Sequence, residues 1–185
     1  MVLSLYNKIE YIGIFVKKVV LSFLFLLGSS MAIELGKVPT SVTIDEKNGG
    51  KIDGSAWKSS MLNGKIHTVF YVDPDKRDLN NPLADALKKK NFDRNKVNSV
   101  AIINLAATWL PNVFIESKLK EKQKKFPHTI YVKDKNKVLV NQWDLADNNS
   151  DILIFDKKGK LLYKKFGKVS EEEIEDVIAL IEKHL

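Results

Sequence analysis

The sequence contains no cysteine among its 185 residues. Disulfides, thiolate metal sites and cysteine nucleophiles are therefore excluded. The nine glycines form neither a dinucleotide-binding fingerprint nor a phosphate-binding loop, and no serine lies in a Gly-x-Ser-x-Gly elbow. We therefore expect no cofactor, and no side chain stands out as the nucleophile of an enzyme.

Arginine is nearly absent, so the formal net charge of +7 comes almost entirely from lysine. Nucleic-acid grooves usually combine arginine with interleaved aromatic residues, so this charge indicates a solvated lysine-rich surface and no nucleic-acid partner. Hydrophobic residues make up 44% of the chain and charged residues 29%, which is ordinary for a globular protein. The length predicts one domain preceded by a leader.

The N-terminal region has the pattern of a secretory leader. Lys17 and Lys18 precede an apolar run over residues 19–28, and Ser30 and Ala32 occupy the two small positions of a cleavage site. The apolar run is short for a membrane span, so the pattern favours cleavage over an uncleaved anchor.

This leader predicts a signal peptide over residues 1–32 and a mature domain over residues 33–185. The mature protein would begin at Ile33, lie in the periplasm and have no stable membrane insertion. The leader is long before Lys17, and a start at Val16, read as an initiating methionine, would give a leader of ordinary length.

The C-terminal third predicts a β-hairpin followed by a helix. An apolar run at residues 152–155 and a second strand at residues 161–166 flank a turn that ends at Gly159. Ser170 and Glu173 form a capping-box pattern that starts the helix. The helix has one apolar face, made of Ile174, Val177, Ile178 and Ile181.

Two hairpins and two central strands are predicted upstream. Residues 41–45 should pair with residues 51–53 across the Asn48-Gly49-Gly50 turn, as an N-terminal hairpin extension. Residues 66–72 and 97–105 are apolar enough for strands buried on both faces. The second hairpin should turn at residues 134–136 and join a strand at residues 129–132 to a strand at residues 138–143.

Two helices should connect the central strands. Asn81 and Pro82 have the pattern of an N-cap and first helical position. Residues 111–125 should form a helix with a lysine-rich outer face, which is either simply solvated or attracted to an anionic membrane or a polyanion. The residues expected to be buried on it are Val113, Phe114, Ile115 and Leu119. The fold class is therefore α/β, a mixed sheet with helices on both faces.

These elements resemble the thioredoxin-like fold, in its exported thiol-disulfide and peroxiredoxin-related branch. The resemblance is carried by residues 62–65 before the first central strand, by Phe126-Pro127, and by residues 150–159. In active members, a catalytic cysteine follows that strand, where this chain has residues 73–78. The cis-proline of active members corresponds to Ser150, so the resemblance implies that both halves of the redox site are missing.

A closer resemblance is to the YtfJ-type family. It is carried by Trp57, residues 142–145 and Asn149-Ser150. The resemblance implies a small, cysteine-poor exported protein that acts as a binding or accessory protein in the periplasm. The family is often labelled a transcriptional regulator, which is the alternative, but no helix-turn-helix pattern supports it.

Candidate binding residues lie on the two loops that replace the redox site. They are Asp73, Asp75, Arg77 and Ser150. Both loops are polar and follow or precede rigid strands, where binding residues tend to lie. We expect an envelope protein as the partner, although the loops could equally be a decayed site.

Metal binding has little support in the sequence. His67, His128 and His184 lie far apart and lack the spacing of paired ligands. The acidic residues around Pro74 could hold a cation, but they are better explained by turn formation. The three tryptophans, which are Trp57, Trp109 and Trp143, are expected in the core or at a sheet edge.

Overall fold

The computed structural model describes residues 32–185, which form one compact unit centred on a six-stranded mixed sheet. The strands, in spatial order, are β2 (Gly49–Lys51), β6 (Thr129–Asp134), β5 (Val97–Asn104), β4 (Ile66–Val72), β7 (Ser150–Phe155) and β8 (Leu161–Phe166). Strands β4, β5 and β6 are parallel to one another, and β7, β8 and β2 run antiparallel to their neighbours. The predicted central strands and the mixed sheet are confirmed.

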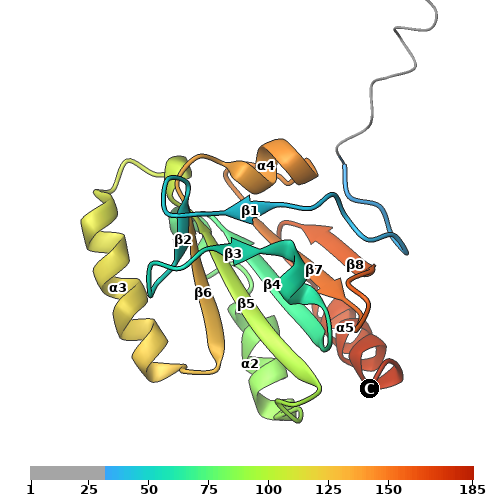
Figure 1. The fold of residues 1–185 in the computed structure, drawn as a ribbon. Helices are drawn as coiled ribbons and strands as arrows, with labels where there is room; N and C mark the ends of the chain where they lie inside the picture. The colour runs from blue at the N-terminus through green and yellow to red at the C-terminus, as the bar shows by residue number, and fades with distance from the viewer. Residues whose placement is uncertain (1–31) are drawn as a thin grey trace, which may run out of the picture. The chain divides into compact units, whose positions relative to one another are not determined.

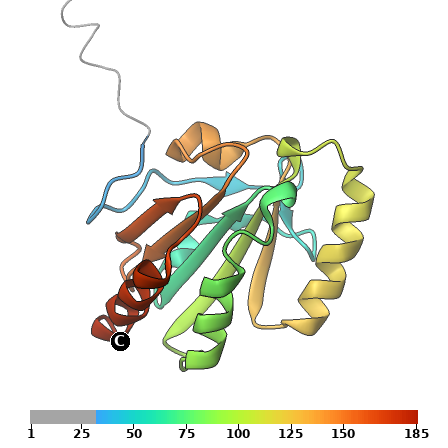
Figure 2. The ribbon, with the colours of Figure 1, turned by 180° about the vertical axis from the view of Figure 1, so that it is seen from behind.

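Helices cover both faces of the sheet, as predicted. One face carries α2 (Asn81–Lys90), α3 (Asn112–Lys125) and α5 (Glu171–Lys183), and Figure 2 shows α2 and α5 in front of the strands. On the opposite face lie α4 (Val138–Trp143) and a small separate sheet formed by β1 (Thr43–Ile44) and β3 (Trp57–Lys58) (Figure 1). Three short 3₁₀ helices complete the fold: η2 (Ser59–Leu62), η3 (Pro74–Lys76) and η4 (Leu105–Ala107).

The C-terminal hairpin and helix form as the sequence predicts. The turn between β7 and β8 includes Gly159 at a φ of 73°, a left-handed conformation that favours glycine. The Ser170 hydroxyl accepts a hydrogen bond from the Glu173 N–H at 3.2 Å, and the Glu173 carboxylate accepts one from the Ser170 N–H at 2.8 Å. This capping box satisfies two N–H groups that would otherwise have no partner at the start of α5.

The predicted pairing of the N-terminal hairpin is wrong. Strand β1 pairs with β3, and β2 instead joins the edge of the main sheet against β6. The reason is a close backbone approach at Gly49, because a Cβ there would lie 2.0 Å from the Lys133 carbonyl oxygen. Gly49, which suggested a tight turn together with Gly50, therefore allows β2 to pack closely against β6.

The second predicted hairpin is also wrong, because residues 138–143 form α4 and not a strand. The buried carboxylate of Asp134 accepts hydrogen bonds from the N–H groups of Val138 at 2.9 Å and Leu139 at 3.1 Å. These hydrogen bonds satisfy backbone N–H groups in the first turn of α4 that have no partner within the helix. This cap, from a side chain four residues before Val138, overrides the strand preference of the valines in this segment.

Several boundary and burial predictions need smaller corrections. The N-cap residue of α2 is Asn80, and Asn81 is the first helical residue. Ile115 and Leu119 are buried as expected, but Val113 and Phe114 are exposed. Trp57 and Trp143 lie in the core, whereas Trp109 is on the surface.

The predicted leader lies outside the described residues, apart from Ala32. Within residues 32–185, no helix is both long and apolar enough to cross a bilayer.

Candidate functional site

A row of polar side chains crosses one face of the sheet where β4 and β5 end. Asp151 of β7 pairs with Tyr71 of β4, and Asp73 lies two residues further along on the same face. Asn104 ends β5 beside Asp73, because the parallel register aligns the preceding residues of the two strands. We call Asp73, Asn104 and Asp151 the carboxylate cluster.

Asp73 is 1% exposed, and neither of its carboxylate oxygens has a hydrogen-bond partner. Burial raises the pKa of Asp73 to about 6, because the charged form loses its hydration. The nearby Asn104 amide and the Asn149 N–H act in the opposite direction, while the Asp147 carboxylate adds to the increase. Asp73 therefore exchanges its proton near neutral pH.

Asp151 is fully buried and has one satisfied oxygen, which accepts a hydrogen bond from the Ala146 N–H at 2.9 Å. Its second oxygen has no partner. Burial raises the pKa of Asp151 to about 7, the Ala146 hydrogen bond partly opposes this shift, and the negative charge of Asp73 reinforces it. Two buried carboxyl groups that repel each other in this way favour a form in which at least one is protonated.

The loop before β7 covers the cluster. Its exposed Asp147 accepts a hydrogen bond from the Asn104 amide at 3.0 Å and forms an ion pair with Lys137. The Lys137 hydrogen bond is the main reason that the pKa of Asp147 is lowered. The charges closest to solvent are therefore paired, whereas the two carboxyl groups beneath them are not.

Ser150 does not face solvent. Its hydroxyl and its carbonyl oxygen accept hydrogen bonds from the Asn80 side-chain amide at 3.0 and 3.2 Å. The same amide reaches the Gly167 carbonyl at 3.0 Å, and the Asn80 oxygen accepts a hydrogen bond from the Val169 N–H at 2.9 Å. Asn80 thus ties the start of α2 to β7 and to the loop before α5.

The structure divides the four predicted binding residues into two groups. Asp75 and Arg77 are exposed, and Arg77 lies 3.3 Å from the Asp78 carboxylate. Asp73 and Ser150 are buried, so the expectation that all four lie on exposed loops is wrong for these two. Sequence reasoning missed Asn104 and Asp151, which the strand register brings to this edge, and Asn80, which its side-chain hydrogen bonds tie to Ser150.

The three histidines lie in separate parts of the described fold. No group of three or more histidine and acidic side chains within residues 32–185 is placed to hold a metal ion. His67 is buried with a lowered pKa, due to the loss of hydration, and its Nδ1 lies 3.1 Å from the Lys65 carbonyl. His128 is exposed, and His184 contacts the Leu180 carbonyl at the end of α5.

The sequence also matches proteins of a known bacterial family. A family model described as "Bacterial protein of unknown function (YtfJ_HI0045)" matches residues 37–184. The chain belongs to the YtfJ_HI0045 family. Two similar relatives are an uncharacterised protein of Haemophilus influenzae, 29% identical over 68% of this chain and 70% of the relative, and the uncharacterised protein YtfJ of Escherichia coli K12, 26% identical over 70% and 72%.

Solved structures show what fold this YtfJ_HI0045 member has. The thioredoxin domain of a thiol-disulfide oxidoreductase from Bacteroides vulgatus matches 81% of this chain and 99% of its own length, with a TM-score of 0.58 and 15% identity. The thioredoxin-like fold is therefore confirmed. Because the chain has no cysteine, it lacks the thiol that dithiol exchange requires.

Residues 73–78 and Ser150 occupy the two places that the resemblance assigns to the redox site. Residues 73–78 follow β4 and contain η3, and none of the described peptide bonds is cis, including the one before Ser150. The resemblance to active thioredoxin-like proteins would place a dithiol and a cis-proline at these positions, and this YtfJ_HI0045 member has there a buried carboxylate cluster and a serine held by Asn80.

Proposed function

We propose that the protein is an exported, non-redox binding or accessory protein of the periplasm. The observation that carries this proposal is that a thioredoxin-like chain without cysteine has residues 73–78 and Ser150 at the two places where the resemblance expects a redox site, with Asp73 and Ser150 both buried. The interior of the site is closed, so the surface above it is available for contacts with a partner. An envelope protein is the partner that best fits an exported protein without a cofactor motif.

The binding surface in this proposal consists of two neighbouring loops. The first contains Asp75, Arg77 and Asp78, which are exposed, and the second contains Asp147 and Asn148. The loops are joined by the hydrogen bond from the Asp73 N–H to the Asn149 carbonyl at 2.9 Å. Rigid strands therefore hold a polar surface with charges of both signs.

A photocrosslinking experiment tests this surface. A photoreactive amino acid at Asp75 should form an adduct with a specific envelope protein in living cells, and the same residue at Lys122 on α3 should not. Arg77→Ala should reduce the yield of the Asp75 adduct several-fold with almost no change in melting temperature, because exposed substitutions shift stability by only about 0.5 kcal/mol. Adducts from Lys122 alone would locate the partner on α3 and contradict the proposal.

Export is tested at the native N-terminus. Mass spectrometry of the protein recovered from the periplasmic fraction should give a chain that begins at Ile33, because Ser30 and Ala32 provide the small residues of a cleavage site. An intact leader on protein found only in the cytoplasmic fraction would refute export.

A further inference from the structure

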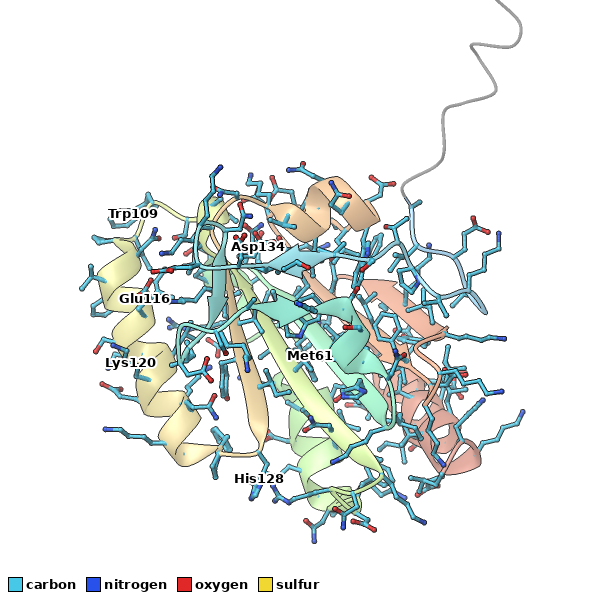
Figure 3. The ribbon with its side chains drawn as sticks, viewed as in Figure 1. Met61, Trp109, Glu116, Lys120, His128 and Asp134 are labelled. Carbon is cyan, nitrogen blue, oxygen red and sulfur yellow. The ribbon has the colours of Figure 1, made fainter. Side chains whose placement is uncertain are left out.

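Three large apolar side chains project into solvent at the start of α3. Trp109 is 86% exposed, Val113 is 81% exposed and Phe114 is 55% exposed. We call these three residues the apolar tip; Figure 3 shows Trp109 at the upper end of α3. The tip is not needed for packing, since α3 is anchored to the sheet by Ile115 and Leu119 on its opposite side.

The rest of the exposed surface of α3 is positively charged. Five lysines are exposed along the helix: Lys118, Lys120, Lys122, Lys124 and Lys125. Of the two acidic residues, Glu116 is half-buried beside Lys133 at 3.5 Å and Lys135 at 3.6 Å. Glu121 pairs with Lys118 at 3.1 Å, so the outward charge remains strongly positive.

The tip and the lysines are continuous along the helix. Phe114, Lys118 and Lys122 follow one another at intervals of four residues, and such positions lie on the same side of a helix. Val113 and Lys120 are separated by seven residues, which again places them on one side. Figure 3 shows Lys120 on α3, further along the chain from Trp109, which precedes the helix.

We propose that α3 and the apolar tip form a docking surface for a membrane that contains anionic phospholipids. Tryptophan and phenylalanine favour the interface between lipid headgroups and acyl chains, and lysine ammonium groups are attracted to anionic headgroups. The apolar side chains stand on a projecting helix start, so they can enter a lipid interface without a complementary cavity. A second copy of the chain is disfavoured, since it would bring the same positive helix against itself.

Trp109 provides a local reporter of this contact. The other two tryptophans, Trp57 and Trp143, are fully buried, so a change in tryptophan emission on vesicle binding reports mainly on Trp109. Vesicles of phosphatidylcholine with phosphatidylglycerol should shift the emission to shorter wavelength, and brominated lipids should quench it. Phosphatidylcholine alone should produce neither effect, and high salt should reverse both by screening the lysines.

Variants of the full chain separate this surface from any contribution of the leader. The double variant Lys120→Gln/Lys124→Gln should need on the order of tenfold more lipid to reach the same emission change. The matched pair Lys89→Gln/Lys183→Gln, on exposed sites of α2 and α5, should not. Trp109→Phe should abolish the signal, which confirms its assignment.

Three outcomes would overturn the proposal. The first is vesicle binding in which Trp109 stays unquenched. The second is an emission shift that grows with protein concentration in the absence of vesicles, which would indicate self-association. The third is equal binding to neutral and anionic vesicles, which would show that the lysines play no part.

Discussion

Replacing Asn80 with alanine should lower the free energy of unfolding by about 4 kcal/mol. The substitution removes the hydrogen bonds to Ser150, to the Gly167 carbonyl and from the Val169 N–H. The Ser150 carbonyl still accepts a hydrogen bond from the Gly167 N–H, but the buried Val169 N–H and Ser150 hydroxyl lose their Asn80 partner, at a cost of about 1–3 kcal/mol each. Denaturant unfolding followed by tryptophan fluorescence measures the change.

Asn81→Ala is the matched control. Asn81 is the next residue and the same side chain, but it is exposed and its amide contacts only Asp78, at 3.1 Å. Its substitution should change the free energy of unfolding by less than about 0.5 kcal/mol. Equal effects at the two positions would show that Asn80 has no special structural role.

Raising the pH from 4 to 8 should destabilise the protein through the carboxylate cluster. Asp151 has a pKa of about 7 when folded, against an ordinary value of 3.8. Between these values the folded state binds more protons than the unfolded state, so its stability falls as the pH rises and levels off above about 7. With a pKa of about 6, Asp73 acts in the same direction over a narrower range.

Asp151→Asn should remove most of this dependence. The amide has the same shape, stays neutral and can still accept the hydrogen bond from the Ala146 N–H. The variant should be more stable than the wild type at pH 8, on the order of 3 kcal/mol, and nearly equal to it at pH 4.

The control is Asp85→Asn, on the exposed side of α2, which should leave the difference between pH 4 and pH 8 unchanged. Thermal and denaturant unfolding at a series of pH values provide the measurement. The prediction would be wrong if the wild-type protein became more stable between pH 5 and pH 8 and the Asp151→Asn variant showed the same pH dependence. That result would show that ionising the carboxylate cluster does not lower the free energy of unfolding.

The sequence was sufficient for elements whose signals are local. Strands β4 and β5 are rich in apolar and β-branched residues, and the capping box of Ser170 and Glu173 defines the start of α5 within its own first turn. The thioredoxin-like arrangement follows from the order of these elements. Local patterns of this kind need no knowledge of distant partners.

The features that sequence analysis missed depend on side-chain and backbone contacts that no hydrophobic pattern shows. Helix α4 forms because Asp134, four residues before Val138, caps it from the end of β6, whereas Gly49 docks against the distant Lys133 across the sheet edge. The burial of Asp73 depends on the loop before β7, which no pattern within residues 73–78 reveals. The expected burial of Phe114 beside Ile115 followed from the apolar character of both residues, but adjacent residues lie about 100° apart around a helix axis, and only Ile115 faces the sheet.

The position of Ile33 has a consequence for the order of events during biogenesis. Ile33 is only 3% exposed, and its N–H donates a hydrogen bond to the Trp143 carbonyl at 3.2 Å. A protease that cuts after Ala32 needs an extended substrate on both sides of the scissile bond, and the folded domain does not offer one beyond Ala32. Under the proposed export, cleavage after Ala32 would have to precede the final docking of the N-terminal segment, and a precursor that folded completely before translocation would resist maturation.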